Sequence, residues 1–231
     1  MDTVALWLTF RLALVTTAIL LVIAVPVSYW LAFTRSRWRT VVQAVCSLPI
    51  VLPPTVLGFY LLVGLGPQTA IGRGISRLLG HTLAFSFAGL VVGSVLYSLP
   101  FAVQPLTAGF AAVDRSMLEA AATLGSGRMD RLLRVILPLA RGSLLTAAVL
   151  SFAHTVGEFG VVLMIGGNLP GATRTLSIAL YDQVQDFQYA QANRTALFLL
   201  AICLVALTLL YTQQREKSAG RGSNLGSSDL V

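Results

Sequence analysis

The sequence is poor in charged residues, cysteine and histidine. Charged residues make up 11% of its 231 positions and apolar residues 56%, whereas soluble domains carry about 25% charged residues. This deficit excludes an ordinary soluble domain, because most of the surface must face something other than water. The two cysteines, Cys46 and Cys203, lie in or beside apolar stretches, and they are too few for a disulfide framework or a cysteine-based metal site.

Motifs for catalysis and nucleotide hydrolysis are absent as well. Neither histidine, His81 or His154, belongs to an H-E-x-x-H zinc motif. The chain contains no G-x-S-x-G nucleophile elbow and no G-x-x-x-x-G-K-S/T phosphate loop. We therefore expect no catalytic residue, no metal and no cofactor on this chain, and no ATP hydrolysis by it.

What the sequence does contain is five apolar stretches long enough to cross a bilayer. About 20 apolar residues span the hydrocarbon core as a helix. The sequence therefore predicts an all-α, polytopic membrane protein with spans at about 12–33, 41–63, 84–103, 144–165 and 195–211. These form one domain, 12–211, which follows a short N-terminal segment, 1–11. The tail, 212–231, is rich in Ser and Gly, and we expect it to be disordered.

The lysines and arginines are distributed unequally between the two sides of these spans. With five spans, eleven of them fall in one set of loops and five in the other. Loops rich in Lys and Arg remain in the cytoplasm, so we expect the N-terminus outside and the C-terminus inside the cell. The net charge of +7 is explained by these basic flanks, and we expect no nucleic-acid partner.

The loop between the third and fourth spans, 114–138, predicts two short helices on the cytoplasmic face. Ser116 and Glu119 have the S-x-x-E spacing of a capping box, which predicts a helix start. Gly125 suits the left-handed residue that ends a helix. Apolar residues then recur at helical spacing from Met129 to Leu137. Taken alone, the pattern fits equally well an amphipathic connector that only covers the bilayer surface.

The same loop resembles the "EAA" loop of ABC importer permeases. The matching residues are Glu119, Ala120, Ala121, Leu124, Gly125, Leu137 and Pro138, with Val135 in place of the usual isoleucine. The resemblance implies a type I importer permease fold. It also implies a coupling helix that docks on a separate ATPase subunit and transmits nucleotide-driven closure to the membrane helices. These residues are thus expected to contact that subunit.

Two spans contain residues that are unusual in a membrane. Pro53 and Pro54 interrupt the second span, and proline removes a helix hydrogen bond. Such irregularity is tolerated only against protein or a water-filled cavity. In the fourth span, Glu158 has His154 one turn before it, a spacing that allows a hydrogen bond between them. An intramembrane acid is read as functional by default, although fixing helix packing explains Glu158 equally well.

Glycines flank that acid, and its charge limits its role. Gly157 and Gly160 would allow another backbone to approach closely. A carboxylate would repel an oxyanion, so the sign of the charge favours a gate or a helix-fixing role over direct binding. We take Pro53, Pro54, His154, Gly157, Glu158 and Gly160 as candidate pathway or gate residues.

Three segments are similar to those of molybdate permeases. They are the proline-rich run from Leu48 to Gly58, the string from Gly157 to Gly160, which is shared with sulfate permeases, and the outer loop from Gly166 to Leu176. The molybdate group is expected to have an arginine where this chain has His154, so a fixed-charge role at that position does not carry over. In the outer loop, Asn168 and Arg174 are candidate contacts for a binding protein.

The resemblance implies the assembly and the location of the chain. It implies a homodimer in the inner (plasma) membrane, with two ATP-binding cassette subunits that carry ATP and Mg and a periplasmic or lipid-anchored oxyanion-binding protein. The expected cargo is molybdate or tungstate, and the alternative within the same fold is sulfate or thiosulfate. From other classes, an ATP-independent channel and an intramembrane enzyme remain as alternatives.

Overall fold

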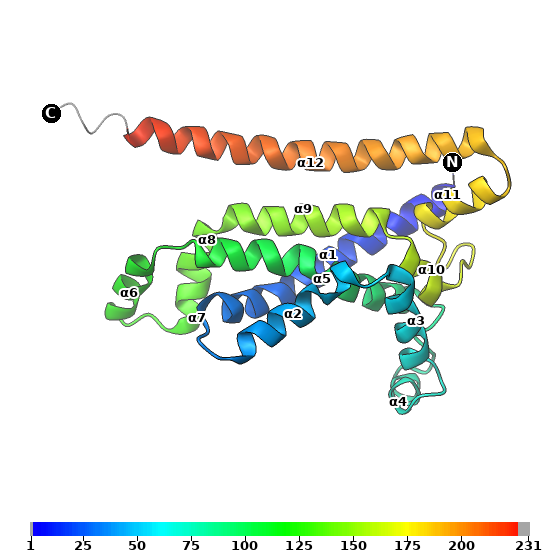
Figure 1. Cartoon of the computed structure of the whole chain (residues 1–231), viewed down its shortest axis with the longest axis horizontal. Helices are drawn as coiled ribbons and strands as arrows, with labels where there is room; N and C mark the ends of the chain where they lie inside the picture. The colour runs from blue at the N-terminus through cyan, green and yellow to red at the C-terminus, as the bar shows by residue number, and fades with distance from the viewer. Residues whose placement is uncertain (1, 226–231) are drawn as a thin grey trace.

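In the computed structural model, which describes residues 2–225 and their side chains from 2 to 213, the chain is helical, with no β-strand among those residues. Figure 1 shows two ends of the bundle: one carries α6 and α7, and the other carries α4 and α11. We refer to them as the α6 end and the α11 end. The elements are α1 (Thr3–Phe33), α2 (Trp38–Val51), α3 (Pro54–Leu65), α4 (Ala70–Leu79), α5 (Phe87–Ala111), α6 (Arg115–Thr123), α7 (Arg128–Arg131), the π-helix η1 (Leu132–Ile136), α8 (Leu137–Leu139), α9 (Arg141–Gly157), α10 (Gly160–Gly166), α11 (Leu176–Gln185) and α12 (Tyr189–Leu225).

Among the described residues, three helices are long and apolar enough to cross a membrane, and two bent helix pairs raise the number to five if each pair counts as one span. The three are Thr3–Phe33, Phe87–Ala111 and Tyr189–Gln213. The pairs are Trp38–Val51 with Pro54–Leu65, bent by 110°, and Arg128–Leu139 with Arg141–Gly157, bent by 77°. The fold class predicted from the sequence is therefore confirmed, although two of the predicted spans are not continuous helices.

The first break separates α2 from α3 inside the predicted span 41–63. Leu52 and Pro53 have extended backbone conformations, and Pro54 is the first residue of α3. Each proline lacks an N–H and disfavours helical conformation in the residue before it, so two in succession favour a break, whereas proline is well suited to a first helical position. The structure thus has a sharp corner where the sequence predicts an interrupted but single span.

A further break, separate from the 77° bend at Ala140, divides the predicted span 144–165 into α9 and α10. Helix α9 ends at Gly157, Glu158 is extended, and α10 begins at Gly160. The hydroxyl of Ser177 donates a hydrogen bond of 2.5 Å to the backbone carbonyl of Glu158. A carbonyl that the helix does not use is therefore satisfied by α11, as burial requires.

The core lies where α1, α5 and α9 pack against one another. Its fully buried apolar side chains include Leu20, Leu31, Leu106 and Phe110. The buried hydroxyl of Ser28 on α1 donates to the carbonyl of Val103 on α5 at 3.1 Å. Helix α12 runs alongside α9 (Figure 1) and leaves leucines exposed, among them Leu197, Leu200 and Leu204. That outer face suits lipid or another protein.

Helices α1 and α12 extend beyond the first and fifth spans predicted from the sequence. Helix α1 starts at Thr3 rather than near residue 12, because the Asp2 side chain accepts the N–H groups of Val4 and Ala5 at 3.0 Å each. Helix α12 continues to Leu225, where the sequence predicts a disordered tail from 212. Gln, Arg, Glu and Lys between 213 and 217 favour helix. Residues 226–231 lie outside the described part of the chain.

Candidate functional site

The predicted coupling loop forms a compact helical unit at the α6 end (Figure 1). Helix α6 begins at Arg115, and the carboxylate of Asp114 accepts the Ser116 N–H at 2.9 Å. That hydrogen bond lowers the pKa of Asp114. The predicted capping box of Ser116 and Glu119 is wrong, because Asp114 occupies the cap and places both residues inside the helix.

Gly125 ends α6 in the left-handed conformation that the sequence predicts. Its φ is +81°, its N–H bonds to the carbonyl of Ala122 at 3.0 Å, and the Ser126 N–H bonds to that of Ala121 at 3.1 Å. These two bonds form a Schellman motif, for which glycine is the favoured residue. No atom lies within 4 Å of a Cβ built at Gly125, so the need for glycine here lies in the backbone angle alone.

The second half of the loop anchors α6 to the bundle. The π-helix η1 buries Leu132 and Ile136 in the same core cluster as Phe110. Leu137 and Pro138 follow in the short helix α8. Toward the outside the unit exposes apolar side chains, with Leu124 88%, Met129 65% and Met117 52% exposed. Glu119 and Ala120 are also exposed, and Ala121 is half-buried. Exposed apolar groups beside a polar helix are typical of a protein-binding surface.

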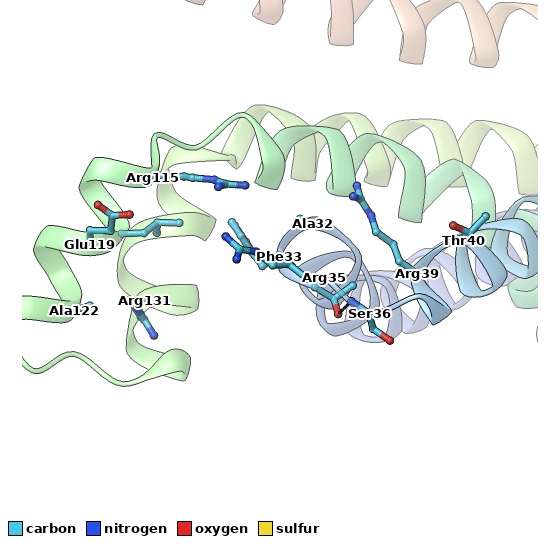
Figure 2. Close-up of a pocket in the computed structure, with 12 residues that line it drawn as sticks. Ala32, Phe33, Arg35, Ser36, Arg39, Thr40, Arg115, Glu119, Ala122 and Arg131 are labelled. Carbon is cyan, nitrogen blue, oxygen red and sulfur yellow. Dashed lines mark hydrogen bonds between the residues drawn. The ribbon is translucent and has the colours of Figure 1, made fainter.

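A cavity of about 510 Å³ lies between this unit and the start of α2 (Figure 2). Arginines from three segments border it: Arg35 and Arg39 near the α1–α2 connection, Arg115 on α6 and Arg131 on α7. Glu119 is the acidic residue at its edge. Within the described residues none of these arginines forms an ion pair. The cavity therefore concentrates positive charge that is available to an anion.

At the other side of the bundle, the two helix breaks pack against each other. A Cβ built on Gly160 would lie 2.6 Å from Cβ of Pro54, and one on Gly58 would lie 2.7 Å from Cβ of Met164. Both distances are far below normal contact, so α3 and α10 approach as closely as glycine permits. Pro54 and Gly160, predicted separately from the sequence, thus meet. Gly157 has open space around it, so the close approach predicted there does not occur within the chain.

His154 and Glu158 do not form the hydrogen bond that their spacing allows. Nδ1 of His154 lies 2.9 Å from the Ser98 hydroxyl, and its ring stacks on Phe101 at 4.0 Å between centroids. The carboxyl of Glu158 is buried, and neither of its oxygens has a hydrogen-bond partner among the described residues. The prediction is wrong because it assumes a continuous helix, and α9 ends at Gly157.

The outer loop is held against α11 by side chains of this chain. Arg174 donates to the Asn168 side-chain oxygen at 2.8 Å and pairs with Asp182 at 3.3 Å. The Asn168 amide also donates to both Asp182 oxygens, at 3.0 and 3.1 Å. Asp182 is not predicted from the sequence, because it carries no local motif and is brought close only by the packing of α11.

For a metal, the described residues offer no group of three or more His, Cys, Asp or Glu side chains close enough to bind one.

Comparison with known proteins places this geometry in a family. Residues 24–215 match the family described as "binding-protein-dependent transport system inner membrane component". The chain is 52% identical to the molybdenum transport system permease protein ModB of Azotobacter vinelandii, over 94% of this chain and 96% of that protein. It is 31% identical to ModB of Escherichia coli K12, over 90% and 92% of the two chains. The predicted resemblance to molybdate permeases is thereby confirmed.

Solved structures agree on the fold. A bacterial ABC transporter involved in the import of the acidic polysaccharide alginate superposes with a TM-score of 0.69 at 16% identity, covering 92% of this chain and 79% of that one. The family match also confirms the prediction of a transport subunit that is not an enzyme. The chain belongs to the binding-protein-dependent transport system inner membrane components, the permease family of ABC importers.

Proposed function

We propose that this chain forms the membrane path through which an ATP-driven importer carries molybdate, or the similar anion tungstate, into the cell. The observation that carries the proposal is the 52% identity to a molybdenum permease over nearly the full length of both chains. The free arginines at the α6 end support an anionic cargo. Sulfate or thiosulfate is the alternative cargo, since the string around Glu158 is also typical of sulfate permeases.

The α6 end faces the cytoplasm in this proposal. The basic loops 34–40 and 114–141 both lie at that end, which is where the unequal distribution of Lys and Arg predicts the cytoplasm. The start of α1, beside α11 at the opposite end (Figure 1), is then outside the cell. A multi-pass location in the inner membrane agrees with the family description.

Three partners complete the proposed machine. Two ATP-binding subunits, which hold ATP and Mg, dock on the coupling surface, which we define as Met117, Glu119, Ala120, Leu124 and Gly125. A second copy of this chain covers part of the exposed membrane face. A substrate-binding protein docks at the α11 end, near Asn168 and Arg174. One matched alginate transporter structure is a complex with its periplasmic protein, which supports this last partner.

The helix breaks are the proposed gate. Pro54 and Gly160 meet at the tight junction between α3 and α10, Pro53 precedes α3, and Glu158 stands at the corner beside it. A broken helix inside a membrane is tolerated where it packs on protein or lines a cavity. Short helices that meet at corners rearrange more readily than one continuous span. His154 and Gly157 lie on the last turns of α9, next to this junction.

Substrate choice tests the proposal directly. The chain, its ATPase and its binding protein would be reconstituted in vesicles, and ATP-driven uptake of molybdate, tungstate and sulfate compared at equal concentration. We expect uptake of molybdate and little uptake of sulfate. Tungstate is expected to be taken up as well if the transporter selects its anion by size and charge alone. Uptake of sulfate in preference to molybdate would establish the alternative cargo.

A further inference from the structure

The structure contains a second cavity, of about 490 Å³, between α2 and α5 at the α6 end. Its polar lining comes from one face of each helix. Arg39, Gln43 and Ser47 follow one another at intervals of four on α2, which places them on the same face. Gln104 and Thr107 border the cavity from α5, and Gln104 donates to the Ser47 hydroxyl at 3.2 Å. These residues make a polar stripe inside two membrane helices.

The polar stripe lies deep enough in the membrane that its side chains lose free energy of solvation unless they face water or a polar partner. At about 1.5 Å per residue, Gln43 lies about 8 Å and Ser47 about 13 Å beyond the start of α2, and Gln104 lies about 10 Å from the end of α5. The side chains of Gln43 and Gln104 are exposed on the surface of the chain. Exposed amides at that depth cannot face hydrocarbon without losing hydrogen bonds. They must therefore face water or a polar partner.

The charges around the stripe select for an anion. Arg39 borders both this cavity and the cavity of the four arginines, so the two meet at its side chain. Among the described residues that border the α2–α5 cavity there is no acid. Neutral amide and hydroxyl donors can replace the water around an oxyanion without holding it as tightly as a buried cation would. An arginine at the end of such a row attracts the anion toward the arginine cavity.

We propose that Gln43, Ser47 and Gln104 line the cytoplasmic stretch of the oxyanion's path, and that Arg39 receives the anion where this stretch opens into the arginine cavity. This assignment rests on the proposed function, because it needs an oxyanion as cargo. It deepens that function by naming the side chains that contact the anion as it passes from the membrane to the cytoplasm. It also explains why two membrane helices carry glutamines on facing sides.

Uptake per ATP hydrolysed is the first test. Gln104→Leu and Arg39→Gln, in the full complex in vesicles, are each expected to lower molybdate uptake per ATP about tenfold, the loss that removal of a hydrogen bond to a charged group brings. Arg39→Lys keeps the charge and retains most of the uptake. Gln68→Leu is the matched control, since Gln68 is exposed on the loop before α4, away from both cavities, and it leaves uptake unchanged.

Thiol labelling separates a water-filled path from a contact between two copies of the chain. In a Cys46→Ser, Cys203→Ser background, Ser47→Cys is expected to react with an anionic aqueous thiol reagent in the assembled complex, and molybdate slows the reaction. The assignment is overturned if Ser47→Cys cross-links between two copies of the chain and does not react with the reagent. It is also overturned if Gln104→Leu and Arg39→Gln take up molybdate normally. In either case, uptake by the wild-type complex leaves the proposed function standing. A wild-type complex that imports no oxyanion overturns both.

Discussion

Gly125→Val is expected to uncouple ATP hydrolysis from uptake. Gly125 has a φ of +81°, and a β-branched residue there costs about 1–2 kcal/mol of backbone strain. The strain falls on the Schellman motif that ends α6 and on the exposed Leu124 just before it. The variant is expected to reach the membrane and bind its ATPase, while uptake per ATP hydrolysed falls severalfold.

Gly125→Asn is the matched control, because asparagine adopts the left-handed conformation more readily than other residues with a side chain. Space is open around this position, so the asparagine side chain fits within the chain. It should retain most of the uptake. If Gly125→Asn loses as much uptake as Gly125→Val, the backbone angle is not what the coupling surface depends on.

Gly160→Ala is expected to disrupt the junction of the two helix breaks. The added methyl would lie 2.6 Å from Cβ of Pro54, so α10 and α3 would have to move apart. Overpacking of this kind costs about 1–3 kcal/mol. We expect a lower midpoint of thermal unfolding for the purified complex and a large loss of uptake, since the junction is the proposed gate.

Gly157→Ala provides the comparison, three residues away. Gly157 is the last residue of α9, and a Cβ there meets nothing within 4 Å. Alanine is also the better helix former. This variant is expected to match the wild type in thermal stability. If both variants lose the same thermal stability, a tight α3–α10 junction is not the cause of the loss. Normal thermal stability of Gly160→Ala would contradict the close packing of Gly160 on Pro54.

The features predicted correctly from the sequence are those with a local physical cause. The length of the apolar runs is enough to predict membrane helices, because the bilayer fixes the length needed. Gly125 is predicted to be left-handed because few other residues adopt that conformation at the end of a helix. The pair Pro53 and Pro54 signals an interruption for the same kind of reason, since proline lacks an N–H.

The features that the sequence does not reveal depend on contacts between distant segments. The 110° corner at Leu52 and Pro53 accompanies the packing of α3 on α10, which no local pattern encodes. Nothing near Glu158 predicts that α9 ends there, because the carbonyl it frees is satisfied by Ser177, 19 residues later. His154 finds Ser98, 56 residues earlier in the chain. The polar stripe likewise emerges only when α2 and α5 are placed side by side.

Capping shows how two local signals can compete. Ser116 and Glu119 have the spacing of a capping box, yet Asp114 two residues earlier caps α6. Aspartate is at least as good a cap as serine, and α5 ends only three residues before it, at Ala111. Helix α6 therefore begins directly after Asp114, which is the first capping residue after α5.

Uptake by sealed vesicles that contain this chain shows directly whether it works as a subunit of an ATP-driven importer. The chain would be reconstituted with and without its ATPase, with ATP on the side of the α6 end and the molybdate-loaded binding protein on the other. An importer permease requires both partners and ATP, so molybdate accumulates only in the complete system. Molybdate entry that does not depend on ATP or on the ATPase would instead show that the chain is a passive channel and not an importer permease.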